Sequence, residues 1–223
     1  MSTNDALPAR GRGSTTWIVA GLAVVVIAVA AYYFWPRNPE HVLIVGDSVS
    51  FMTAPELEHE FSGSDAEIIA IPGFTSSDLL GLAVHAIDER AKAGKELDRA
   101  IFLVGYNDVW KDQPDSPDLN RMVAASARYR CAIWLTLPGR PGGKPPAAAK
   151  FDPRRYDVWN ARVTKLVGEH RQLHLVTEWS ETVDGAPAGR YLNPDGIHPN
   201  HEGSKTLARI MHDSLISKCR FAG

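Results

Sequence analysis

The chain has 223 residues, 44% of them hydrophobic and 22% charged, which is enough apolar material for one sizeable folded core. Its formal net charge is −2, and no long run of lysine and arginine interrupts it. The sequence therefore supplies no positive field for a phosphate backbone, which argues against nucleic-acid binding. The composition also argues against a repeat protein and against a disordered chain.

The first predicted element is a run of nineteen residues, Trp17 to Trp35, without a charged or strongly polar side chain. As a helix rising ~1.5 Å per residue it would be roughly 28 Å long, close to the thickness of a bilayer's hydrocarbon core. Aromatic residues at both ends suit the membrane interfaces. We therefore expect a transmembrane anchor at 17–35. The alternative is a buried core helix, but the segment has no polar face and contains five valines and a glycine, which are poor helix formers.

The charges that flank this run predict its orientation. Arg10 and Arg12 precede it, whereas Arg37 is the only cation close behind it. The positive-inside tendency places a tail, residues 1–16, in the cytoplasm and everything after the span outside. The chain is then a single-pass protein of the cell membrane with an extracytoplasmic domain.

A cleaved signal peptide is the competing interpretation of the same segment. Ala28, Val29 and Ala30 form a small-x-small cleavage pattern after an apolar stretch. The apolar run continues for five residues beyond that pattern, which favours an uncleaved anchor. Under either interpretation the domain, residues 41–223, is exported, with residues 36–40 as a linker.

Beyond the linker, short apolar runs alternate with longer helical patterns, which is typical of a parallel sheet covered on both faces. The predicted strands are His41 to Val45, Ala66 to Ile71, Ala100 to Val104, Cys131 to Leu137 and Leu173 to Thr177. The predicted helices are Ser76 to Ala93, Asp152 to about His170 and Asn200 to Lys218. Their capping residues and 3.6-residue apolar spacing support these helices.

Two further features are open to more than one interpretation. The loop Pro138 to Lys150, rich in glycine, proline and alanine, follows a predicted strand; it is either a wall of a ligand cleft or a tolerated surface insertion. Cys131 and Cys219 are the only cysteines, and no metal-ligand spacing surrounds them. In an oxidising compartment they would form a disulfide, and otherwise they are two separate buried thiols.

The residues that suit chemistry lie where predicted strands end. Ser48 follows the first strand in a Gly-Asp-Ser sequence, where a sharp turn can expose a nucleophilic hydroxyl. Gly73 follows the second strand, and Asn107 follows the third. A glycine N–H and an asparagine amide are donors that can stabilise an oxyanion. Each also has an ordinary structural role in turns and caps.

A fourth signal precedes the last predicted helix, where Asp195 and His198 flank a glycine-containing turn. This spacing allows the carboxylate to contact one imidazole nitrogen while the other nitrogen faces a serine. Asp195 would then select the imidazole tautomer, and His198 would accept and return the proton of Ser48.

Taken together, these four blocks resemble the SGNH (GDSL-like) hydrolase superfamily. They are Gly46-Asp47-Ser48-Val49-Ser50, Gly73, Gly105-Tyr106-Asn107-Asp108 and Asp195-Gly196-Ile197-His198. The resemblance, over about residues 41 to 218, implies a three-layer α/β/α fold with a five-stranded parallel sheet of order 2-1-3-4-5. It also implies a triad of Ser48, Asp195 and His198, and an oxyanion hole built from Ser48, Gly73 and Asn107. Tyr106 stands where a small residue is common, which we expect to narrow the mouth of the pocket.

The implied activity is ester hydrolysis through an acyl-serine, without a metal or organic cofactor. The predicted tether favours removal of a short acyl group from an envelope glycan or lipid, with Tyr106 and Trp110 as candidate substrate contacts. Trp110 and Trp179 could stack on sugar rings, and the alternative for both is packing in the core or at its rim. One alternative is an O-acyltransferase with the same triad, which would need a separate membrane partner to supply acyl groups. The other is a non-catalytic envelope-binding module.

Overall fold

The apolar runs expected to form strands do so in the computed structural model, which describes residues 39–141 and 152–220. All strand pairs are parallel, and the sheet has the order β2-β1-β3-β4-β5. The strands are β1 (His41–Gly46), β2 (Asp65–Ala70), β3 (Arg99–Leu103), β4 (Cys131–Leu135) and β5 (Leu173–Val176). The predicted α/β fold and its strand order are confirmed, with strand ends displaced by at most two residues.

Burial follows each strand's place in the sheet. Every residue of β1 and β4 is buried, because these strands have neighbours on both sides and helices on both faces. β2 lies at an edge, and its first three residues are exposed. The core continues between the strands, where the rings of Phe102 on β3 and Trp134 on β4 stack with centroids 4.7 Å apart.

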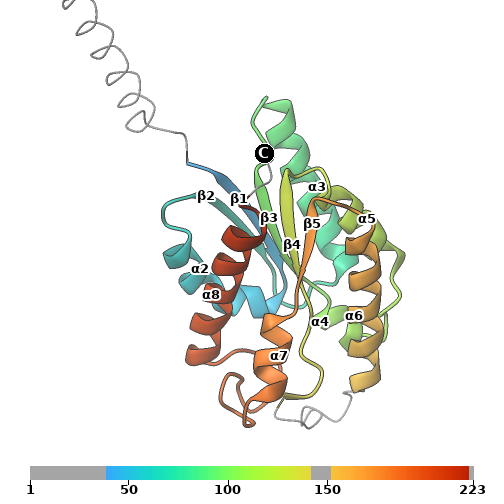
Figure 1. Ribbon diagram of the computed structural model, residues 1–223. Coiled ribbons are helices and arrows are strands. Elements are labelled where there is room, and N and C mark those ends of the chain that lie inside the picture. The colour runs from blue at the N-terminus through green and yellow to red at the C-terminus, as the bar shows by residue number, and fades with distance from the viewer. Residues whose placement is uncertain (1–38, 142–151, 221–223) are drawn as a thin grey trace, which may run out of the picture. The chain divides into compact units, whose positions relative to one another are not determined.

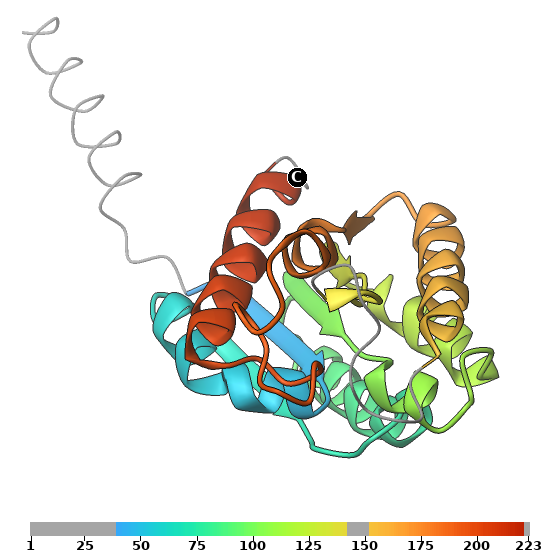
Figure 2. The same ribbon diagram turned by 90° about the horizontal axis from the view of Figure 1, so that it is seen from below.

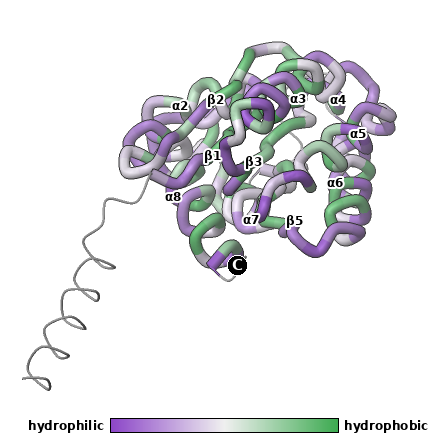
Figure 3. The backbone as a smooth tube through the Cα atoms, turned by 90° about the horizontal axis from the view of Figure 1, so that it is seen from above, coloured by the Kyte–Doolittle hydropathy of each residue, from purple (hydrophilic) through white to green (hydrophobic). Residues whose placement is uncertain are grey.

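Helices cover both faces of the sheet (Figure 1). One face carries α2 (Ser48–Glu60), α7 (Glu178–Gly185) and α8 (His201–Lys218), which pack on one another and on the strands. The other carries α3 (Ser76–Lys92), α5 (Pro117–Ser126) and α6 (Pro153–Gly168), while the short α4 (Tyr106–Trp110) contacts α6. Hydrophilic and hydrophobic residues alternate along these helices (Figure 3), as expected of helices with one face on a core.

Capping side chains explain where the predicted helices begin. Asp152 accepts a hydrogen bond from the N–H of Arg154, and Pro153 is the first residue of α6. The cap of α3 is Thr75, one residue before the predicted start, and Thr75 forms a reciprocal capping box with Asp78. Asn200 caps α8 through the N–H of Gly203.

Four helices were missing from the sequence prediction, and α2 is the most consequential because Ser48 is its first residue. Pro55 lies inside α2, and a proline removes one helical hydrogen bond and usually ends a helix. The apolar residues of α2 also follow no clear helical period. The others are α4, α5 and α7, which have between five and ten residues each.

Cys131 and Cys219 form a disulfide across 88 residues of chain. Cys131 begins β4, and Cys219 is the C-terminal cap of α8, with Cα atoms 5.7 Å apart. The bond fastens the last helix to the sheet. Of the two interpretations that the sequence left open, the structure contains the bonded one.

Replacing both cysteines by alanine is expected to lower the free energy of unfolding by about 4 to 5 kcal/mol. The reason is that the disulfide closes a loop of 88 residues in the unfolded chain. Urea unfolding of the variant, and of the wild type with and without dithiothreitol, measures this. A difference below about 1 kcal/mol would show that the bond contributes little to stability.

The predicted tail and membrane span, residues 1–35, lie outside the described residues. Within residues 39–141 and 152–220, no helix combines the length and apolarity that crossing a bilayer needs.

Candidate functional site

The candidate residues meet at the carboxyl edge of three adjacent strands. Gly46, the last residue of β1, pairs with Ala70 of β2 on one side and with Leu103 of β3 on the other. Ser48, Gly73 and Asn107 each follow one of these strand ends by two to four residues. Figure 2 shows the domain viewed from the side of this edge. In open α/β sheets, ligands bind at the carboxyl edge.

Ser48 is placed by a strand that passes into a helix within two residues. Asp47 caps α2 by accepting the N–H of Val49 at 3.1 Å, and Ser48 is the first helical residue. The close packing at this junction requires glycine at position 46, where a Cβ would lie 2.0 Å from the Oγ of Ser50 and 2.9 Å from the carbonyl oxygen of Leu103.

Ser48, His198 and Asp195 form one continuous chain of hydrogen bonds. His198 Nε2 lies 2.9 Å from Ser48 Oγ, and His198 Nδ1 lies 2.9 Å from Asp195 Oδ2. The other carboxylate oxygen of Asp195 accepts the backbone N–H groups of Ile197 at 2.8 Å and His198 at 2.9 Å. The structure therefore brings together the three residues predicted to form a triad, in the predicted order of contacts.

Partial burial alone would raise the pKa of Asp195. The hydrogen bonds from Ile197 and from both the backbone and the ring of His198 outweigh it, and they hold the pKa of this carboxyl below its usual range. Asp195 therefore stays ionised beside the imidazole and can stabilise an imidazolium.

Two asparagines that sequence analysis did not single out hold the loop that carries His198. The side-chain amide of Asn200 donates to the carbonyl groups of three residues, Gly189, Arg190 and Leu192. Asn193 donates its side-chain amide to the carbonyl of Pro199, at 3.1 Å. A signal was present in Asn193-Pro194 and Pro199-Asn200, the pairs on either side of the Asp-Gly-Ile-His block, because asparagine and proline are both typical of turns.

Gly73 lies in a tight turn between β2 and α3. The N–H of Phe74 donates to the carbonyl of Ile71 at 3.3 Å, and Gly73 has a φ of +82°. This is the conformation expected of a Pro-Gly pair at the centre of a type II turn, where glycine is favoured. Gly73 is exposed, and a Cβ at this position would meet no atom within 4 Å.

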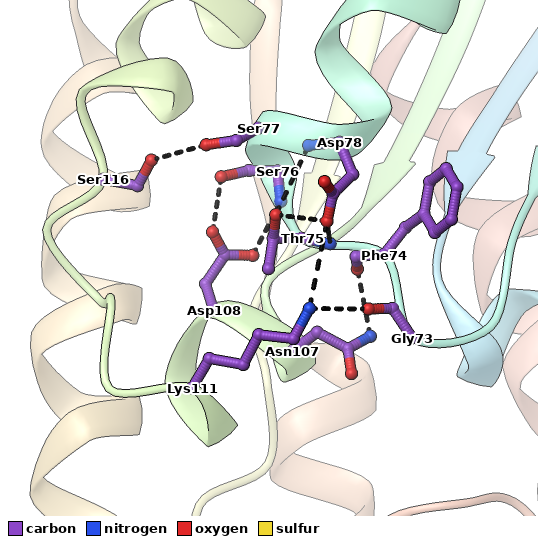
Figure 4. Close-up of polar contacts among 10 residues, drawn as sticks. All are labelled: Gly73, Phe74, Thr75, Ser76, Ser77, Asp78, Asn107, Asp108, Lys111 and Ser116. Carbon is purple, nitrogen blue, oxygen red and sulfur yellow. Dashed lines mark hydrogen bonds and ion pairs between the residues drawn. The ribbon is translucent and has the colours of Figure 1, made fainter.

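Asn107 lies on α4 and is half-buried. Its Nδ2 donates to the carbonyl oxygen of Phe74 at 3.0 Å, so its side chain points toward the loop that contains Gly73 (Figure 4). An asparagine amide has two N–H groups, and this bond uses one of them.

The expectation that Tyr106 contacts substrate is wrong, and of the two interpretations of Trp179 the structure contains core packing. Tyr106 is 4% exposed and Trp179 is fully buried, and the indole N–H of Trp179 donates to the hydroxyl of Tyr106 at 3.1 Å. The two rings belong to the core beneath the site. Gly105, which has a φ of +120°, leaves room for the ring of another buried tryptophan, Trp159, which a Cβ at this position would overlap. Trp110, in contrast, is 40% exposed.

Only part of the loop Pro138 to Lys150 falls within the described residues. There, the N–H groups of Gly139 and Arg140 donate to Asp184 of α7, at 3.1 and 2.8 Å. The interpretation as a cleft wall concerns residues 142–150 as well, which lie outside the described ranges. A groove of about 630 Å³ lies elsewhere, between β2 and α3, and contains none of the candidate residues.

Two buried carboxyl groups lie beneath the site. Burial raises the pKa of Asp47 to about 7, although the N–H of Val49 favours its charged form, and the charge of Asp108 adds to the increase. Burial also raises the pKa of Asp108, against the hydrogen bonds that it accepts from Ser76. Among the described residues, no three His, Cys, Asp or Glu side chains gather closely enough to hold a metal ion.

The raised pKa of Asp47 predicts a pH-dependent stability. The unfolded chain releases this proton near its ordinary pKa of 3.8, whereas the folded protein retains it up to about pH 7. Folding therefore takes up a proton between about pH 4 and 7, and stability from this group falls as pH rises through that window. Relative to wild type, we expect the free energy of unfolding of Asp47→Asn to increase by at most about 1.4 kcal/mol for each pH unit in this window. Urea unfolding of both proteins at four pH values measures this; a pH-independent difference would contradict it.

Comparison with known proteins agrees with this architecture. A GDSL-like lipase from Bacteroides thetaiotaomicron superposes with a TM-score of 0.60 at 17% identity, covering 86% of this chain and 97% of that one. The catalytic domain of peptidoglycan O-acetyltransferase A from Streptococcus pneumoniae superposes with a TM-score of 0.53 at 14% identity, over 83% and 96%. An acetylxylan esterase from Geobacillus stearothermophilus gives 0.52 at 16%, over 83% and 96%. Among curated proteins, no sequence matches this chain significantly.

These likenesses to solved structures concern the fold. The family assignment comes from a sequence match that spans Ser48, Gly73, Asn107, Asp195 and His198. Residues 45–206 match the model of the GDSL-like lipase/acylhydrolase family, well over half of the chain, and the chain therefore belongs to this family.

Proposed function

We propose that this protein is a serine ester hydrolase that acts through an acyl intermediate on Ser48. The observation that carries the proposal is the continuous contact from Ser48 Oγ through His198 to Asp195, with both hydrogen bonds at 2.9 Å. A non-catalytic binding module has no physical need for this arrangement, because binding alone does not require a serine activated by a base.

The proposed reaction uses the hydrogen bonds that link Ser48, His198 and Asp195. Ser48 Oγ attacks the ester carbonyl while His198 Nε2 accepts its proton, and Asp195 stabilises the resulting imidazolium. When the tetrahedral intermediate collapses, His198 donates that proton to the leaving alkoxide. A water molecule then attacks the acyl-serine by the same route, which releases the acid and restores the hydroxyl of Ser48.

Three donors form the oxyanion hole in this proposal. The N–H of Ser48 is at the first position of α2 and has no acceptor within the helix. The N–H of Gly73 and the second N–H of Asn107 complete the proposed oxyanion hole. Loss of one such donor typically lowers kcat by about 10²- to 10³-fold.

We propose a short acyl ester of an envelope glycan or lipid as the substrate. Exposed apolar side chains flank the site: Phe51 and Met52 lie one turn after Ser48 on α2, and Trp110 lies near Asn107 on α4. These side chains suit the apolar face of a sugar ring or a short acyl group. The same fold serves an acetylxylan esterase and a peptidoglycan O-acetyltransferase, whose names link both proteins to acetyl groups on glycans.

We propose that the domain acts outside the cytoplasmic membrane, held by the predicted span at 17–35. The disulfide between Cys131 and Cys219 supports this location, because such bonds form and persist in oxidising compartments.

Hydrolysis of p-nitrophenyl acetate, butyrate and palmitate by the full-length protein tests the proposal, with Ser48→Ala as the matched control. We expect Ser48-dependent turnover that falls with acyl length, and release of acetate from acetylated xylan or acetylated peptidoglycan. Equal rates for wild type and Ser48→Ala on every ester would contradict the hydrolase and favour a binding module.

An O-acyltransferase is the second candidate, favoured by the structural likeness to peptidoglycan O-acetyltransferase A. In that reaction a sugar hydroxyl, supplied in place of water, attacks the same acyl-serine, and a separate membrane partner would supply the acyl group. Adding a glycan acceptor to the p-nitrophenyl acetate assay separates the two. Acetylated glycan detected by mass spectrometry, at the expense of free acetate, would favour the transferase.

A further inference from the structure

The loop that carries Gly73 is held by side chains of α4 and of Lys111, the residue that caps the C-terminal end of α4 (Figure 4). Lys111 Nζ donates to the carbonyl of Gly73 at 3.1 Å, and Asn107 Nδ2 donates to the next carbonyl, that of Phe74, at 3.0 Å. Asn107 and Lys111 are four residues apart, so they share one face of the helical segment. Asp108 completes the attachment by accepting the N–H of Ser76 at 2.8 Å.

This loop needs such an attachment because little else fixes Gly73. The residue is exposed, has no side chain, and would meet no atom within 4 Å even with a Cβ. The hydrogen bond that closes its turn, from Phe74 to Ile71, is long at 3.3 Å. Glycine loses more conformational freedom on ordering than any other residue, so the direction of its peptide groups depends on the bonds that its neighbours make.

Lys111 contacts both the loop and the first turn of α3. Besides the carbonyl of Gly73, its ammonium lies 4.0 Å from Asp78 Oδ2. Asp78 in turn accepts the N–H of Thr75 at 2.9 Å and its hydroxyl at 2.7 Å, and these two hydrogen bonds, with a smaller contribution from the charge of Lys111, lower the pKa of Asp78. The bond from the ammonium to the Gly73 carbonyl is charge-assisted and therefore stronger than a neutral one.

We propose that Lys111 is a positioning residue that orients Gly73 for the oxyanion hole. The inference rests on the proposed function, in which the N–H of Gly73 stabilises the tetrahedral intermediate. An oxyanion donor lowers the barrier only when it is already aimed at the position where charge develops. Lys111 holds Gly73 in the required orientation through its hydrogen bond to the Gly73 carbonyl, without contacting the reacting atoms. It lies outside the four sequence blocks that identify the site.

The test compares Lys111→Met and Lys111→Arg with wild type and with Lys92→Met. Lys92 is a matched control, because it is an exposed lysine whose partner, Glu89, lies on the same helix, α3. With p-nitrophenyl acetate, we expect Lys111→Met to lower kcat about tenfold, less than the loss of a direct donor, with KM within about twofold. Lys111→Arg should recover most of kcat, and Lys92→Met should match wild type.

A boronic acid that forms a tetrahedral adduct on a serine supplies a second measurement. Its affinity should fall by a factor similar to the loss in kcat, while thermal stability stays unchanged. A Lys111→Met protein with wild-type kcat, a change confined to KM, or an equal loss in Lys92→Met would overturn the positioning role alone. Absence of Ser48-dependent turnover in the wild type would overturn the proposed function, and the positioning role with it.

Discussion

His198→Ala is expected to lower kcat for p-nitrophenyl acetate by about 10⁴- to 10⁶-fold while the protein stays folded. His198 Nε2 is 2.9 Å from Ser48 Oγ, and no other base is assigned to receive that proton in the mechanism. The hydroxyl of serine is a weak nucleophile without such a base. The remaining rate would come from substrate binding and the oxyanion hole, which act without the histidine.

His212→Ala is the matched control for this prediction. His212 also contacts a carboxylate, that of Asp213 at 3.1 Å, but it lies on α8 and has no role in the proposed reaction. We expect its kcat to equal that of wild type. Circular dichroism and thermal unfolding would verify that both variants are folded. A His198→Ala protein within about tenfold of wild type would mean that another group activates Ser48.

Asp195→Asn is expected to lower kcat by about 10³- to 10⁴-fold, through the tautomer of His198. An asparagine oxygen can still accept the N–H groups of Ile197 and His198, as Oδ1 of Asp195 does. The amide nitrogen would then face Nδ1 of His198, which would have to become an acceptor. The proton would move to Nε2, the nitrogen that must accept the proton of Ser48.

The loss in Asp195→Asn should appear in kcat, with KM little changed, because Asp195 is not proposed to contact substrate. Asp213→Asn is the matched control, since it changes the other His–Asp contact in the same way. NMR of the imidazole nitrogens would report the tautomer directly. If His198 kept its proton on Nδ1 in Asp195→Asn and kcat still fell, a change of tautomer would not be the cause of the loss.

The fold was predictable because the information lies in short, local patterns. β1, β3 and β4 are nearly continuous apolar runs, and apart from Arg99 at the start of β3 their residues are buried, as such runs require in a parallel sheet. Helix α6 was marked by Asp152 and Pro153 in adjacent positions. Helix α2 was missed because Pro55 and an irregular apolar pattern contradict a helix locally, and packing against α8 and the sheet overrides them.

The site was predictable to the extent that its residues lie in sequence blocks at strand ends. The burial of Tyr106 was not, because this residue follows a strand end as a substrate-facing residue would, and only the assembled core shows its contact with Trp179. The role of Lys111 depends on a contact with Gly73, 38 residues away, which no local pattern encodes. The disulfide joins cysteines 88 residues apart, and the sequence left open whether they are bonded.

Covalent labelling of the full-length protein with a fluorophosphonate tests the central claim, an activated nucleophile at Ser48, most directly. The reagent phosphonylates an activated serine, and mass spectrometry of the digested protein locates the adduct. We expect one adduct, on Ser48, with esterase activity lost in parallel, and greatly slowed labelling of His198→Ala. Absence of any adduct, or an adduct on another residue while activity persists, would contradict the account.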